Sequence, residues 1–158
     1  MGALRPDAGI DCKPRRTGLP NHASAGVECR PGLRYVDRVG AYYFANTDDM
    51  LAAYSGRMSE YGVRTNGGNC LGGTSSETGW GPSFAPDDPD MPWARAGCYL
   101  DENNIANVRL TCDEHTYVGI LGTNSDLRAL FSWAFFADGG YVPPGMPPGI
   151  CVVGGEVY

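Results

Sequence analysis

Lysine is almost absent from this sequence of 158 residues: Lys13 is the only one, whereas arginine occurs 11 times. Acidic residues number 18, so the net charge is -6. Nucleic-acid binding needs a cationic surface that neutralises phosphates, and an anionic membrane attracts cationic segments. We therefore expect no nucleic-acid partner and no adhesion to an anionic membrane surface.

Long apolar runs and targeting signals are also missing. The longest apolar stretch, residues 130–137, is far shorter than the ~18 residues of a membrane-spanning helix. The N-terminus has no hydrophobic signal region, and no N-x-[ST] glycosylation sequence occurs. We expect no membrane insertion of this segment, and an export signal would have to be supplied from outside it.

Catalytic signatures are equally scarce. There is no G-x-S-x-G sequence for a nucleophilic serine, and only two histidines, His22 and His115, are present. Pairs of acids for glycoside hydrolysis could be drawn from Glu77, Asp88, Asp101 and Glu102, but any acidic chain offers as much. We expect a protein that is not an enzyme.

Cysteine, in contrast, is abundant, and no C-x-x-C pair suggests a zinc site. The spread of the six residues favours three disulfides, which are typical of extracytoplasmic or secreted proteins. Six cysteines permit 15 connectivities, and spacing does not single one out. The set we favour closes the long central loop and pins both tails: Cys12 with Cys29, Cys70 with Cys98, and Cys112 with Cys151.

Periodicity predicts a mixed fold. A strand is expected over residues 36–45, and a helix capped at its start follows over residues 47–61. Alternation of apolar and polar residues predicts strands at 97–100, 106–112 and 117–121, before a second helix at 126–136. The order β-α-loop-β-β-β-α predicts an α+β two-layer sandwich: an antiparallel sheet with both helices on one face.

The regions outside this pattern are rich in proline and glycine. We expect an irregular N-terminal arm over residues 1–34, a single α+β domain over 35–137, and a proline- and glycine-rich tail over 138–158. Residues 64–94 should form a long loop within the domain. A loop of that length is either functional or held down by disulfides.

Aromatic and acidic residues gather in and next to this loop. Aromatic rings beside carboxylates can stack on sugars or hold cations, which predicts a ligand site. The alternative is that the tryptophans fill space under a braced loop. Acidic stretches at 87–90 and 101–104 make calcium a candidate ion, although neither fits an EF-hand loop. The candidate ligand-binding residues are Trp80, Trp93, Tyr99, Glu77 and Asp88.

Five segments resemble a domain of high-GC bacteria: VGAYYF, DDMLAAY, GNC, AGCYLDENNIANVRL and YVGILGTNSDLRALFSW. The domain follows the transmembrane helix in actinobacterial-type serine/threonine kinases and also occurs in exported proteins. The resemblance covers residues 27–136 and rests on markers of fold rather than of chemistry. It implies a small extracytoplasmic sensor or binding domain without catalytic activity, and the scarcity of lysine is typical of a high-GC genome.

The sequence thus predicts a non-catalytic extracytoplasmic binding or sensor domain. Its ligand would be an extracellular small molecule, a glycan or a protein, and a homo-oligomer is one expected form. Two alternatives stay open. One is a structural subunit of an extracellular assembly or filament, and the other is a small secreted hydrolase with an unrecognised site.

Overall fold

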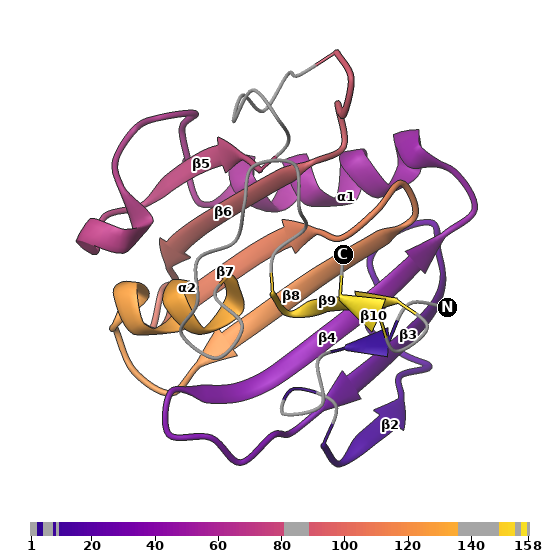
Figure 1. Ribbon diagram of the computed structural model, residues 1–158, viewed down its shortest axis with the longest axis horizontal. Coiled ribbons are helices and arrows are strands. Elements are labelled where there is room, and N and C mark those ends of the chain that lie inside the picture. Colours follow the sequence, from indigo (N-terminus) through magenta and orange to yellow (C-terminus); the bar gives the residue numbers. More distant parts are fainter. Residues whose placement is uncertain are drawn as a thin grey trace.

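A seven-stranded antiparallel sheet forms the centre of the molecule (Figure 1). The computed structural model describes residues 3–4, 8, 10–80, 89–135, 149–153 and 156–157. The strands lie in the order β2 (Cys12–Pro14), β3 (Ala23–Cys29), β4 (Val36–Phe44), β8 (Thr116–Gly122), β7 (Ala106–Thr111), β6 (Arg95–Leu100) and β5 (Ser76–Gly79). The predicted α+β class, antiparallel sheet and disulfide bracing are confirmed.

Helix α1 (Thr47–Glu60) agrees with the prediction to within one residue. Its N-cap is Asn46, whose side-chain oxygen accepts a 2.8 Å hydrogen bond from the backbone N–H of Asp49. This bond satisfies an amide that has no partner within the helix. The helix buries Met50, Tyr54 and Met58, which are spaced to share one face.

Helix α2 (Leu127–Phe135) also lies where the apolar periodicity predicts it. The Asp126 carboxylate accepts a 3.0 Å hydrogen bond from the backbone N–H of Ala129 and so caps the first turn. Leu127, Leu130 and Phe131 are among the side chains that the helix buries.

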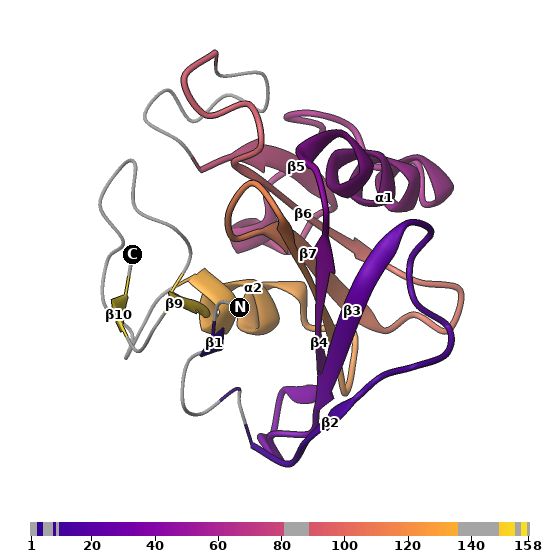
Figure 2. The ribbon, with the colours of Figure 1, turned by 90° about the vertical axis from the view of Figure 1, so that its right-hand side faces the viewer.

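The two helices lie on opposite faces of the sheet, so the expectation that both share one face is wrong (Figure 2). Alternation along β8 shows the reason: Tyr117 packs edge-on against Tyr54 of α1, whereas its neighbour Val118 belongs to the cluster that includes α2. Each face of the central strands carries its own cluster of buried apolar and aromatic side chains, and each cluster therefore needs its own cover. The core beneath α2 is mainly aliphatic, with Trp80 and Phe131 among its members, and the core beneath α1 consists mainly of tyrosine and methionine.

The N-terminal arm is also more regular than expected. Strands β2 and β3 lie within residues 1–34 and join the main sheet next to β4, with Cys12 paired to Cys29 in register. The irregular composition hides them because β2 is short and exposed. A second small sheet pairs β9 (Cys151–Val153) with β1 (Ala3–Leu4) and β10 (Glu156–Val157). Residues 138–148 of the predicted tail lie outside the described part of the chain.

The segment 64–94, expected as a loop, contains the 3₁₀ turn η1 (Cys70–Gly72) and strand β5. Strand β5 pairs with β6 and forms an edge of the sheet. Sequence periodicity does not predict β5 because its four residues stand in a stretch of sequence rich in serine, glycine and proline.

Three disulfides brace this fold, and they are the set favoured from the sequence. Cys12–Cys29 joins β2 to β3, Cys70–Cys98 joins η1 to β6, and Cys112–Cys151 joins the residue after β7 to the small sheet. Among the described residues, no helix has the length and apolar character needed to cross a membrane.

Candidate functional site

Of the aromatic residues singled out from the sequence, Trp80 and Tyr99 are buried and Trp93 is partly buried. Trp80 is 3% exposed and contacts Trp93 edge-on, with ring centroids 5.3 Å apart. Its indole N–H donates a 2.9 Å hydrogen bond to the backbone carbonyl of Thr111. The structure therefore brings the two tryptophans together as packing against the α2-side core.

Tyr99 and Glu77 lie on the other face of the sheet. Tyr99 is 1% exposed and stacks on Tyr61 with centroids 4.3 Å apart. The Glu77 carboxylate accepts a hydrogen bond of 3.1 Å from the hydroxyl of Thr65. Asp88 lies outside the described residues. Because Trp80 and Tyr99 belong to different cores, the four described candidates do not line one open site.

The acidic stretch at 101–104 forms the turn between β6 and β7. One oxygen of Asp101 accepts hydrogen bonds from the backbone N–H groups of Asn103 and Ile105, and the other accepts one from the Asn107 side chain. Both oxygens of the Asp101 carboxylate therefore have hydrogen-bond donors, and the turn does not require a cation. Of the other stretch, only Pro89 and Asp90 are described, and no metal-binding group of three or more His, Cys, Asp or Glu occurs among the described residues.

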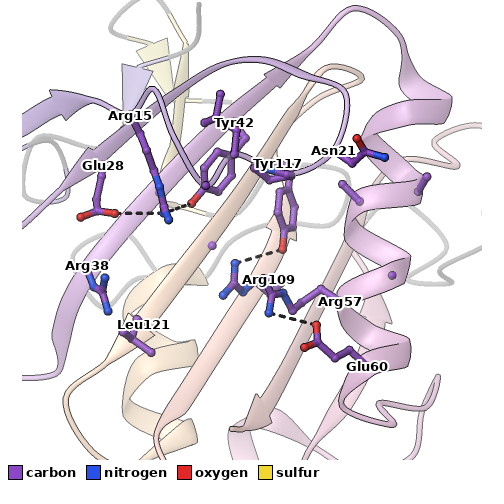
Figure 3. Close-up of a pocket in the computed structure, with 18 residues that line it drawn as sticks. Arg15, Asn21, Glu28, Arg38, Tyr42, Arg57, Glu60, Arg109, Tyr117 and Leu121 are labelled. Atoms are coloured by element: carbon purple, nitrogen blue, oxygen red, sulfur yellow. Dashed lines mark hydrogen bonds and ion pairs between the residues drawn. The ribbon is translucent and has the colours of Figure 1, made fainter.

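A groove that the sequence did not reveal lies on the α1 face of the sheet (Figure 3). Its volume is about 440 Å³, a size common for small-molecule sites. Helix α1 forms one wall, the segment 15–21 forms the other, and β4, β8 and β7 form the floor. The charged side chains that line this groove are Arg15, Glu28, Arg38, Arg57, Glu60 and Arg109.

Arg109 lies on the floor and is the most unusual of these residues. Its two terminal nitrogens donate 3.3 Å hydrogen bonds to the Tyr117 hydroxyl and to the side-chain oxygen of Asn107. Its Nε is shielded from solvent and has no hydrogen-bond partner. Within the described part of the chain, no carboxylate forms an ion pair with this guanidinium.

The charge on Arg109 is nevertheless permanent. Burial disfavours the charged form, but the neighbouring hydroxyls of Tyr117 and Tyr99 favour it, and the net effect holds the pKa above its usual value. The position of the group is set by Asn107, which donates to Asp101 and accepts from Arg109. Asp101 thus reaches Arg109 only through the Asn107 amide, and no carboxylate among the described residues forms an ion pair with this guanidinium.

Glycine on the neighbouring strands makes room for this guanidinium. The register places Glu28, Gly40, Gly119 and Arg109 side by side across β3, β4, β8 and β7. A Cβ on Gly119 would lie 2.9 Å from Cζ of Arg109, and a Cβ on Gly40 would lie 2.9 Å from Cζ of Tyr42. Any larger residue would displace these side chains. The two glycines therefore let Arg109 and Tyr42 lie directly against the backbone of the groove floor.

The wall opposite α1 is held by Arg15. This side chain donates to the Glu28 carboxylate at 3.2 Å, to the Tyr42 hydroxyl at 3.0 Å and to the carbonyl of Thr17 at 3.1 Å. Three contacts from one guanidinium fix the position of the segment 15–21, which carries the rest of the wall.

Arg38 and Arg57 complete the cationic lining. Each has an acidic neighbour: Arg38 pairs with Asp37 at 2.9 Å, and Arg57 pairs with Glu60 at 3.2 Å. Their side chains stay 40% and 39% exposed, so a ligand can reach them. Exposed pairs of this kind contribute only about 0–1 kcal/mol, and an incoming anion can compete for them.

No family model, no curated protein and no solved structure matches this chain. The groove therefore has to be judged on its own geometry. Sequence reasoning missed it because its charged residues are far apart in the chain and meet only through strand register. The sequence offers one weak indication of the groove. Arg38 and Gly40 are two residues apart on a predicted strand, so they lie on the same face, where the glycine leaves space beside the charge.

Proposed function

We propose that the chain is a non-catalytic extracytoplasmic binding or sensor domain whose groove beside α1 holds an anionic ligand. The observation that carries the proposal is Arg109, a partly buried guanidinium with no carboxylate partner among the described residues. A carboxylate, sulfate or phosphate group on the groove floor would supply the missing charge. Guanidinium groups are well suited to such planar or tetrahedral anions.

The energetic cost of burying Arg109 supports this assignment. Removing a charge from water without a counter-ion costs several kcal/mol for a fully buried group. The two hydrogen bonds of Arg109 go to neutral acceptors and are long, so they offset only part of that cost. A residue that is unfavourable for folding and lies in a groove is a candidate binding residue.

The disulfides support an extracytoplasmic location. All six cysteines are paired, and disulfides persist mainly in oxidising compartments. The resemblance to the domain that follows the transmembrane helix of actinobacterial-type kinases would make the ligand a signal. A groove of small-molecule size suits such a sensor. A ligand that binds one conformation of a receptor more tightly than another shifts the receptor toward that conformation.

The test is a titration of the isotope-labelled protein with glucuronate, sulfate and neutral glucose, observed by NMR. We expect the two anions to shift signals of the Arg109 side chain and of its neighbours Gly119 and Tyr117, whereas glucose has no effect. Arg109→Met should abolish these shifts, and the matched variant Arg128→Gln, exposed on α2, should keep them. Shifts that persist in Arg109→Met, or no response to any anion, would overturn the proposal.

The assembly and hydrolase alternatives stay predictions. A strict monomer by mass measurement in solution would remove the assembly. A turnover that a single substitution abolishes in the purified protein would favour the enzyme over the binding domain.

A further inference from the structure

A second pocket lies against the same wall as the groove. Its volume is about 330 Å³, and it shares Arg15, Gly18 and Glu28 with the first. The Arg15–Glu28 ion pair, 3.2 Å long, is therefore the partition between two adjoining hollows. Lys13 and Arg30 add two further cations on the far side of the partition.

The two pockets together concentrate the positive charge of the molecule. Among the described residues, six cationic side chains line the two pockets, whereas only three acidic ones do. The rest of the chain is correspondingly more acidic than the net charge of -6 suggests. Such a local reversal of sign focuses anionic ligands onto one surface.

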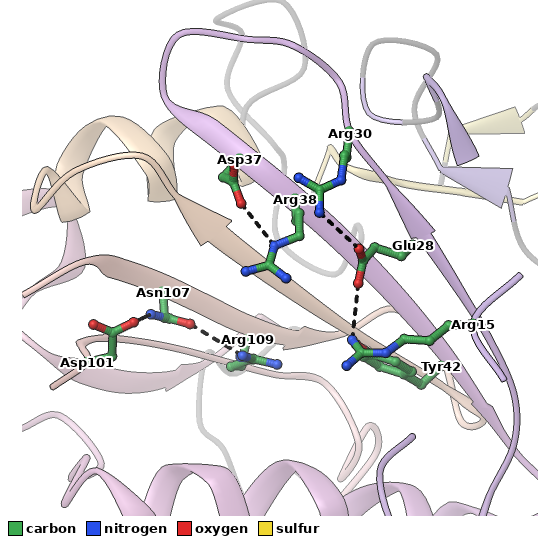
Figure 4. Close-up of polar contacts among 9 residues, drawn as sticks. All are labelled: Arg15, Glu28, Arg30, Asp37, Arg38, Tyr42, Asp101, Asn107 and Arg109. Atoms are coloured by element: carbon green, nitrogen blue, oxygen red, sulfur yellow. Dashed lines mark hydrogen bonds and ion pairs between the residues drawn. The ribbon is translucent and has the colours of Figure 1, made fainter. Parts of the chain in front are cut away.

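The strand register gives this surface a direction. Lys13 pairs with Glu28, and the row continues through Gly40 and Gly119 to Arg109. Five adjacent strands at a spacing of about 4.8 Å place the ends of the row about 19 Å apart. Figure 4 shows Arg30, Glu28 and Arg15 in contact, with Arg38 and Arg109 further across the sheet. A row of this length is longer than one small anion and could contact several linked units.

Acidic groups are interspersed among the cations that line the two pockets. Glu28 lies between Lys13, Arg15 and Arg30, and Glu60 lies beside Arg57. A densely charged polymer such as nucleic acid would meet repulsion at each carboxylate. A polymer with separated negative charges and hydroxyl groups between them would instead donate hydrogen bonds to these carboxylates.

We propose that the two pockets form one cleft for a linear acidic polysaccharide, whose carboxylate-bearing units run from Lys13 and Arg30 past Arg15 to Arg38 and Arg109. The proposal rests on the proposed function, since it names the ligand class of the same groove. The Arg109 end binds one acidic unit, and each further unit adds contacts toward β2. Affinity therefore grows with chain length until the row is filled.

The test measures binding of galacturonate and of its di-, tetra- and hexasaccharides by calorimetry. We expect each doubling of length to tighten binding until the cleft is filled, with a total gain of at least about tenfold. Lys13→Gln with Arg30→Gln should cost the hexasaccharide about tenfold and leave the monosaccharide unchanged, because only longer chains reach that pocket. Arg109→Met should weaken every ligand, and Arg128→Gln should weaken none.

The outcomes separate the two proposals. If galacturonate binds but chain length and the Lys13 and Arg30 substitutions have no effect, the cleft is wrong and the anion groove stands. If poly-glutamate of equal charge binds as tightly as the hexasaccharide, the polysaccharide class is wrong. If no anion binds, both proposals are wrong.

Discussion

Replacing Arg109 by methionine is the most informative perturbation of the groove. Methionine keeps the unbranched apolar stem and removes the charge together with its five donors. The two hydrogen bonds lost, each 3.3 Å long, contribute about 1 kcal/mol each. The substitution also removes the cost of desolvating a partly buried, unpaired guanidinium, which raises the free energy of unfolding by about 2–3 kcal/mol.

These two effects nearly cancel. We expect the free energy of unfolding of Arg109→Met to lie within about 1 kcal/mol of the wild-type value, or slightly above it. The matched control is Leu110→Ala on the same strand, which removes a fully buried side chain from the α2 core and should cost about 2–5 kcal/mol. Denaturation in urea, followed by circular dichroism with the disulfides intact, measures both.

Binding provides the second readout. Glucuronate should raise the melting temperature of the wild type and leave that of Arg109→Met unchanged. A loss of more than about 2 kcal/mol in Arg109→Met would show that the guanidinium is retained for folding, and our reasoning about the groove would then be refuted.

Three further changes test neighbouring parts of the argument. Gly119→Ala places a methyl group 2.9 Å from Cζ of Arg109; because that side chain is flexible, we expect a stability loss of about 1 kcal/mol or less and loss of glucuronate binding by calorimetry. Burial raises the pKa of Tyr99 to about 12, so the unfolded state loses its proton first, and stability should fall as the pH rises from about 10 to about 12. The full loss is about 2–3 kcal/mol, and urea denaturation at each pH should show a smaller fall in Tyr99→Phe. Replacing Cys12 and Cys29 by serine opens a loop of sequence separation 17, which should lower the free energy of unfolding by about 3 kcal/mol; an unchanged urea midpoint would contradict a bracing role.

Local patterns account for much of what could be predicted. Helix α1 follows from the Asn46 cap and from the spacing of Met50, Tyr54 and Met58, which are signals contained within 15 residues. The sequence allowed 15 disulfide connectivities, and the one favoured because it closes one loop and holds two tails is the one in the structure. Strand β5 was missed because a short edge strand between glycine-rich loops has no periodicity of its own.

The candidate ligand residues illustrate the opposite case. Trp80 and Tyr99 look alike in the sequence as aromatic residues near carboxylates. Strand alternation sends one to the α2 core and the other to the α1 core. The sequence contains the alternation, but which face each helix covers depends on the path of the chain between sheet and helix.

By itself, the sequence determined the α+β class and the positions of both helices, since both depend on composition or short-range periodicity. Only the tertiary structure decided that α1 and α2 cover opposite faces and that Arg15, Arg38 and Arg109 meet in one groove. These arginines come from separate strands and loops, and only the register of the sheet sets their distance from one another. Register is a property of paired strands, so no single segment of the chain encodes the groove.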